Sequence, residues 1–198
     1  MAVNTNDVTS LENLLIENLH SYRDIICPNS PDVYEEILDG AVRTALTIIS
    51  RTDALYHDVE HTCLVTLCGQ DIYLGRELRR GDLSHSDWLH FTIACLFHDI
   101  GYVRGLLDDD DEEDGQRIDS DGNKIQLPAQ STDAALTPYH VYRGQEFVIS
   151  RNWHPDIDVT YLASLISQTE FPVPANRNIE GANDKNFREL AQLIQSAD

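Results

Sequence analysis

Apolar and polar positions alternate with helical spacing over most of the chain. In seven segments apolar residues recur every three or four positions, and capping residues, prolines or glycines bound these segments. We therefore expect helices over about 9–26, 31–50, 58–80, 84–98, 137–153, 158–169 and 184–198. The segment 84–98 is apolar on almost every side, which is typical of a buried central helix. The pattern predicts an all-α domain of about seven helices.

The helical pattern is interrupted between residues 105 and 130. Residues 108–114 are all acidic, and Asp121-Gly122 then lies between two short stretches that mix apolar and polar residues. This arrangement favours a small β-hairpin around 115–127. A calcium-binding loop is disfavoured, because Lys124 stands where an EF-hand loop needs glycine. We expect a solvated acidic loop and hairpin inserted into a single domain over 1–198, with residues 1–50 as an N-terminal helical extension.

The charge balance limits the partners of the chain. Its 198 residues include 34 Asp and Glu against 14 Lys and Arg, a formal net charge of −20. Such a surface repels nucleic acids and anionic membranes, so we expect a small-molecule partner. An anionic ligand would need a local positive charge, which a bound divalent metal could supply.

The sequence also indicates the cellular compartment. It has no apolar run long enough for a transmembrane helix and no pattern typical of a signal peptide, so we expect a cytoplasmic protein. None of the cysteines forms a Cys-x-x-Cys pair, and we interpret them as reduced thiols. They are Cys27, Cys63, Cys68 and Cys95.

Two short segments carry candidate chemistry. His57 and His61 are four residues apart, a spacing that places two side chains on one helical face. His98-Asp99 ends the most apolar helix, and a buried carboxylate there must be paired, capped or bound to metal. Imidazole and carboxylate together are the usual ligands of a mixed nitrogen and oxygen divalent site. The two segments, about 40 residues apart on neighbouring helices, predict one metal site.

These segments resemble a known family. The stretch Cys-Leu-Phe-His-Asp-Ile-Gly-Tyr over 95–102 is similar to the central motif of the HD-domain superfamily of metal-dependent phosphohydrolases. The spacing Tyr56-His57-x-x-x-His61 is similar to the signature of class I cyclic-nucleotide phosphodiesterases, with Asp58 where those enzymes usually have asparagine. The resemblance runs from about Thr52 to the end and implies an HD-domain-like helical bundle. The first 50 residues and the acidic insertion carry none of it.

The resemblance assigns roles position by position. It implies metal ligands at His61, His98, Asp99 and Asp198, with the Asp99 carboxylate able to bridge two metals. His57 matches the general acid that protonates the leaving oxygen. We therefore expect one or two divalent ions (Mg, Mn, Zn or Fe) and hydrolysis of a phosphomonoester or phosphodiester of a nucleotide-like small molecule. The last helix of that family usually continues beyond its aspartate, so we expect the natural chain to extend past Asp198.

Other residues carry weaker signals. His140 and Arg143 lie three apart on one helical face, in a region where some HD proteins place an additional histidine or a phosphate-binding residue, so we assign both to substrate binding. His154 is a further candidate, and the segment 167–170 is expected to line a pocket. We interpret the remaining histidines as ordinary surface or core residues. They are His20, His85 and His90.

Three other functions fit parts of the sequence. His57-x-x-Glu60-His61 matches the inverted zincin motif of metallopeptidases, with Glu60 as the base, but that interpretation leaves His98-Asp99 unexplained. A metal-containing HD domain could instead bind a nucleotide without hydrolysing it. An HD-type di-iron oxygenase needs more ligands, which His140 and His154 could provide.

Overall fold

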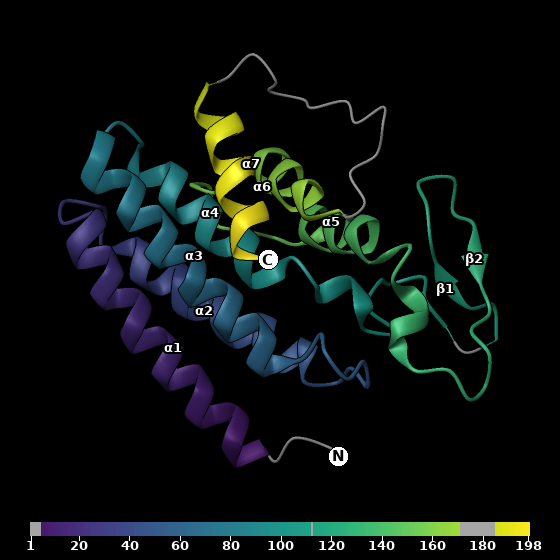
Figure 1. The fold of residues 1–198 in the computed structure, drawn as a ribbon. Coiled ribbons are helices and arrows are strands. Elements are labelled where there is room, and N and C mark those ends of the chain that lie inside the picture. Colours follow the sequence, from purple (N-terminus) through teal and green to yellow (C-terminus); the bar gives the residue numbers. More distant parts are fainter. Residues whose placement is uncertain (1–4, 112, 171–184) are drawn as a thin grey trace.

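The structure is a computed structural model that describes residues 5–111, 113–170 and 185–198. Its α-helices are α1 (Thr5–Ile26), α2 (Val33–Ile49), α3 (Val59–Arg80), α4 (His85–Phe97), α5 (His140–Ser150), α6 (Val159–Ile166) and α7 (Lys185–Ala197). Short 3-10 turns are η1 (Ile100–Tyr102), η2 (Asp133–Leu136) and η3 (Ser167–Thr169), and the strands are β1 (Gln116–Arg117) and β2 (Lys124–Ile125). The prediction of a helical fold with one small hairpin is confirmed (Figure 1).

Helix α4 lies at the centre of the molecule. It packs against α2, α3, α6 and α7, while α1 packs on the outer side of α2 and α3 (Figure 1). All ten residues of α4 from Trp88 to Phe97 are buried, as the apolar pattern predicts. One hydrophobic cluster extends from Val8 on α1 to Ile194 on α7, so the N-terminal helices share the core of the rest of the chain.

Local capping fixes where the helices that carry the site begin. Asp58 is the N-cap of α3, and its carboxylate accepts the backbone N–H of His61 at 2.9 Å. Ser84 and Asp87 form a reciprocal capping box at the start of α4. Because α3 begins only after Asp58, His57 lies in the preceding loop. The expectation that His57 and His61 share one helical face is therefore wrong.

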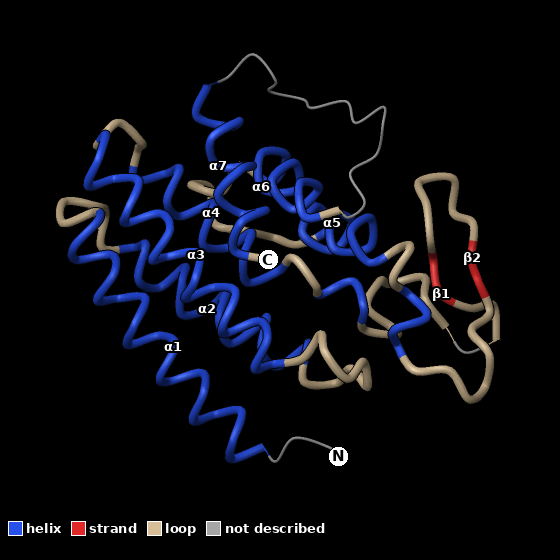
Figure 2. Tube along the Cα trace, in the orientation of Figure 1, coloured by secondary structure: helices blue, strands red, loops and turns tan. Residues whose placement is uncertain are grey.

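The insertion forms the hairpin that the sequence predicts. Strands β1 and β2 are antiparallel and lie at the edge of the molecule far from α1 (Figure 2). The Asp119 carboxylate accepts backbone N–H groups of Asp121 and Asn123, each at 3.0 Å, and Gly122 adopts a φ of 78°. Asp119 thus stabilises the turn by its side chain, as is usual for aspartate in tight turns.

The acidic loop is only partly solvated, contrary to expectation. The Asp110 side chain is fully buried and pairs with Arg143 at 2.9 Å. Leu106 and Leu107 are also buried, whereas Asp108 and Asp109 are exposed. A buried carboxylate requires a paired cation and hydrogen-bond donors, and the sequence pattern gave no sign that Arg143 provides them.

Helix α5 approaches the turn η1 very closely. A Cβ atom on Gly101 would lie 1.8 Å from the backbone oxygen of His140 and 2.8 Å from the backbone nitrogen of Gly144. Only glycine leaves room for this contact. Gly101, two residues after Asp99, therefore allows the first turn of α5 to pack against the end of the central helix.

The structure bears on the expected reduced cysteines and on the expected lack of a transmembrane helix. All four cysteines are free thiols, and only Cys68 is exposed. Within the described residues, no helix combines the length and the apolar character that crossing a membrane requires.

The contact at Gly101 predicts a large difference between two glycine substitutions. Gly101→Ala should lower the free energy of unfolding by about 2 kcal/mol or more, because its methyl group meets backbone atoms that cannot move aside. Gly40 lies inside α2 with no atom within 4 Å of an added Cβ, so Gly40→Ala should raise stability by about 0.5–1 kcal/mol. Urea unfolding of both variants measures the difference, and equal effects would contradict the packing of α5 on η1.

Candidate metal centre

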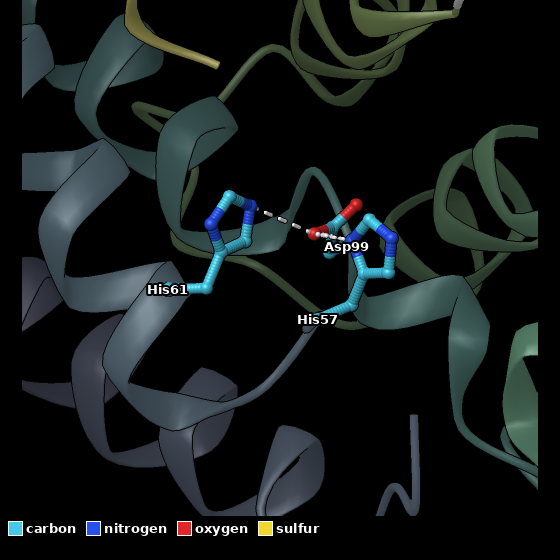
Figure 3. A group of neighbouring side chains, drawn as sticks. All are labelled: His57, His61 and Asp99. Carbon is cyan, nitrogen blue, oxygen red and sulfur yellow. Dashed lines mark hydrogen bonds and ion pairs between the residues drawn. The ribbon is translucent and has the colours of Figure 1, made fainter. Parts of the chain in front are cut away.

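Four elements bring imidazole and carboxylate groups to one place. His57 comes from the loop before α3, His61 from the first turn of α3, His98 and Asp99 from the end of α4, and Asp198 from the end of α7. Figure 3 shows His57 and His61 on either side of the Asp99 carboxylate. The structure thus gathers all the residues that the HD resemblance singles out as ligands or acid.

One carboxylate oxygen of Asp99 contacts three imidazoles. Its Oδ2 lies 2.7 Å from His57 Nδ1, 3.1 Å from His98 Nε2 and 3.3 Å from His61 Nε2. The Asp99 side chain is 4% exposed, so water contributes little to its solvation. A buried carboxylate in this position depends on the positive charge or hydrogen atoms of its neighbours.

Asp198 completes a second side of the cluster. Its Oδ1 lies 3.5 Å from His98 Nε2 and 3.7 Å from His61 Nε2, and the two Nε2 atoms are 3.4 Å apart. Together with the contacts to Asp99 Oδ2, five separations among four ligand atoms lie between 3.1 and 3.7 Å. In a tetrahedral site with bonds of about 2.1 Å, ligand atoms are about 3.4 Å apart. These five separations lie near that value, but Asp99 and Asp198 fall in different groups of possible ligands. One group is His57, His61 and Asp99, the other is His61, His98 and Asp198, so the described residues offer two overlapping candidate metal sites that share His61.

The orientation of His98 also fits a metal ligand. Its Nδ1 lies 2.8 Å from the backbone oxygen of Cys95, and a carbonyl oxygen only accepts, so Nδ1 donates. A neutral His98 ring then directs the lone pair of Nε2 at Asp99, Asp198 and His61. Fixing one ring nitrogen on a carbonyl so that the other faces the ion is the usual arrangement of ligating histidines.

Without a metal, protons on the imidazoles must balance the negative charges of the Asp99 and Asp198 carboxylates. Burial opposes protonation of His61, but hydrogen bonds to Asp198 and Asp99 outweigh it and raise the pKa of His61 to about 9. His98 is also buried, yet the Asp99 and Asp198 carboxylates hold its pKa well above the usual value. Conversely, burial would raise the pKa of Asp99 and of Asp198, but the adjacent imidazoles lower both. The metal-free cluster therefore binds protons where a metal would replace them.

His140 faces the other oxygen of Asp99. Its Nε2 lies 3.8 Å from Asp99 Oδ1, and its Nδ1 donates to the backbone oxygen of Thr137 at 2.7 Å. Burial lowers the pKa of His140, which favours the neutral ring.

The Tyr102 ring stacks on two histidines of the site, at a centroid distance of 4.0 Å from His57 and 4.4 Å from His140. Sequence reasoning missed Tyr102, although it follows His98-Asp99-Ile-Gly directly.

Arg143, assigned to substrate binding from sequence, does not face this cluster. Its side chain is fully buried and points instead to Asp110 and to backbone oxygens of residues 101, 103 and 117. Its guanidinium has no exposed surface that a substrate could contact. The three-residue spacing from His140 is real, but the long side chain turns inward, which spacing alone does not reveal.

The other candidate residues lie apart from the cluster. His154 is exposed beside a groove formed with α2 and pairs weakly with Asp156. His20 pairs with Asp39, and His90 accepts the backbone N–H of Asp158 at 2.8 Å.

The segment 167–170 and Glu60 also have other surroundings. The side chains of Gln168 and Thr169 donate to backbone oxygens of α6, and the backbone oxygen of Gln168 accepts from the side chain of Gln195. Glu60 is exposed and belongs to neither group of described residues that could hold a metal.

The chain was compared with known proteins. The model of a family described as Npun_R2479-like matches residues 5–198. No curated protein and no solved structure matches.

The raised pKa of His61 predicts that metal binding releases protons. At pH 7 a group with a pKa of about 9 is protonated, and only the deprotonated ring binds metal. Zinc affinity should therefore rise about tenfold per pH unit for each displaced proton between pH 6 and 8. Calorimetry in buffers of different ionisation enthalpy counts those protons, and a pH-independent affinity would contradict the cluster.

The same shift predicts a pH dependence of stability in the metal-free protein. Because the folded-state pKa of His61 is raised, its stabilising contribution is complete below the unfolded value of about 6.5 and is lost as pH rises through about 9. The melting temperature should fall over this interval with a chelator present and change less with zinc bound. His61→Gln should flatten the metal-free profile.

Proposed function

The chain belongs to the Npun_R2479-like family, and we propose that it is a metal-dependent phosphohydrolase of the HD-domain type. The observation that carries the proposal is the convergence of ligand atoms from His61, His98, Asp99 and Asp198, joined by five contacts of 3.1–3.7 Å. These are the positions at which the sequence resembles the HD superfamily. The helical fold and the buried helix that ends in His98-Asp99 support the same assignment.

The donor set favours particular metals. Two imidazole nitrogens and two carboxylate oxygens suit zinc, iron or manganese better than magnesium, which prefers oxygen ligands and water. When bound, such an ion supplies an activated water and a positive charge for phosphoryl oxygens. That charge would offset the net charge of −20, which otherwise repels an anionic substrate.

His57 is the best placed general acid in the cluster. Its side chain is 27% exposed, against 9% for His61 and none for His98, so a substrate reaches it most easily. His57 Nδ1 lies 2.7 Å from Asp99 Oδ2 and donates to this carboxylate, which orients the ring. With Nδ1 occupied by Asp99, a proton carried on Nε2 is the one that His57 could give to a departing oxygen. A nucleotide-like phosphomonoester or phosphodiester is the substrate class that we propose.

A dinuclear centre is a second candidate, and the position of His140 favours it. Its neutral Nε2 and Asp99 Oδ1 are both lone-pair donors 3.8 Å apart, so His140 and Asp99 would hold such a second ion. With iron in both positions an oxygenase becomes the competing function. His154 lines a groove with residues of α2 and belongs to neither group of possible ligands, contrary to the role considered for it. Two irons per chain with a visible absorption band would favour oxidation over hydrolysis.

Substitution of Asp99 tests the proposed metal site. Asp99→Ala and the isosteric Asp99→Asn should both lose metal binding and phosphoester hydrolysis, because Asp99 Oδ2 contacts three of the proposed groups. His154→Ala, an exposed histidine outside the cluster, is the matched control and should keep both. Metal analysis, circular dichroism and a metal-supplemented screen of nucleotides, cyclic nucleotides and generic phosphoesters measure the outcome. Full metal content in the Asp99 variants would overturn the site, whereas a metal-loaded wild type without turnover would indicate a non-catalytic sensor.

Substitution of His57 distinguishes a general acid from a metal ligand. His57→Ala should keep the metal but slow hydrolysis of an ester with a poor leaving group by about 10²–10⁴-fold. A nitrophenyl phosphoester, whose leaving group needs little protonation, should be affected much less. Equal losses on both substrates would assign His57 to substrate positioning. Loss of metal would make it a ligand, consistent with its contact to Asp99.

A further inference from the structure

The guanidinium of Arg143 is saturated with hydrogen bonds inside the protein. It donates to the backbone oxygens of Gly101 and Val103 at 2.8 Å each and to that of Arg117 at 2.8 Å. It also donates to both carboxylate oxygens of Asp110, at 3.1 and 2.9 Å. These five bonds use the complete fork of an arginine, which lysine cannot reproduce.

The partner carboxylate is saturated as well. Besides Arg143, Asp110 accepts the backbone N–H of Leu107 at 2.9 Å and that of Arg117 at 2.8 Å. Both side chains of the pair have no exposed surface. A buried ion pair is tolerated at this depth when its remaining donors and acceptors are satisfied, as they are here.

The acceptors of Arg143 belong to two different parts of the chain. Gly101 lies in the turn η1, which carries Tyr102, and Val103 directly follows this turn. Asp110 and Arg117 belong to the acidic insertion. One guanidinium therefore connects the insertion to the turn that leaves the metal cluster.

Arg143 also connects this turn to His140. It lies on α5 one helical turn after His140, and α5 rests directly on Gly101. Besides the backbone contact at Gly101, this buried group thus ties together the elements that carry Asp99, Tyr102 and His140.

We propose that Arg143 and Asp110 form a positioning pair for the metal centre, and that through them the acidic insertion over 105–130 is an integral part of the site. The inference rests on the proposed metal centre for its functional meaning. Neither residue touches substrate or metal; both hold the backbone that places Asp99, Tyr102 and His140. The insertion is thereby assigned a role that its acidic composition alone does not suggest.

The test separates positioning from stability. The double variant Arg143→Met with Asp110→Leu removes both charges together, so neither is left buried without its partner. The backbone groups that the pair bonds lose their partners, so we expect some loss of stability. It also removes the donors to the oxygens of Gly101 and Val103. We expect a cooperatively folded protein whose zinc affinity falls about tenfold to a hundredfold, the range typical of groups that orient ligands. Asp109→Asn, half-exposed in the same acidic run, is the matched control and should keep the wild-type affinity.

A second readout does not depend on metal. The backbone N–H groups of Tyr102 and Val103 donate within η1, to residues 99 and 100. Their hydrogen-exchange protection should fall in the double variant and in Arg143→Lys, which keeps the charge but not the fork. Wild-type protection and affinity in the folded double variant would overturn the proposal. If the double variant does not fold, Arg143→Lys decides by the same two measurements.

The outcomes also distinguish this inference from the proposed function. A wild-type protein that binds no zinc, manganese or iron would remove the proposed function, while the exchange measurement would still decide whether Arg143 holds the turn. Normal metal binding in wild type with unchanged protection in Arg143→Lys would remove only the positioning role.

Discussion

The arrangement of the site depends on how the negative charge of one buried carboxylate, that of Asp99, is balanced by neighbouring groups. Asp99 lies at the end of the most apolar helix, where solvation by water is lost and the charge must be balanced by neighbouring groups. His57, His61 and His98 provide that balance, and Asp198 adds a second negative charge beside two of them. Two carboxylates among three imidazoles hold either protons or a cation. This requirement, rather than the presence of histidines as such, makes the cluster a candidate metal centre.

The surrounding fold serves this arrangement by close backbone contacts. Gly101 allows α5 to approach within a distance that no side chain permits, and this contact brings His140 to Asp99. The capping aspartate Asp58 begins α3 so that His61 enters the cluster from its first turn. The position that distinguishes this chain from the phosphodiesterase signature therefore has a local structural role, since aspartate and asparagine are both good helix caps.

The sequence alone predicted only those site residues that lie close together in short segments of the chain. His98-Asp99 at the end of an apolar helix and His57 with His61 were identifiable because a few adjacent residues define them. Tyr102 was missed, although its place after the motif was visible, because ring stacking depends on partners from other elements. Arg143 was assigned to substrate because its spacing from His140 was known, while its partner Asp110 lies 33 residues earlier in the chain.

The sequence by itself determined the helices, the buried character of α4 and the hairpin at Asp121-Gly122, because periodicity, caps and turn residues act over a few positions. It also determined which residue types could bind a metal. The meeting of Asp198, which follows α7, with His61 of α3 was implied only by the family resemblance, and the tertiary structure brings it about. Only the tertiary structure decided that one acidic residue of a charged loop is buried while its neighbours are solvated. The physical reason is that these contacts arise from the packing of elements far apart in the chain, and local composition does not specify that packing.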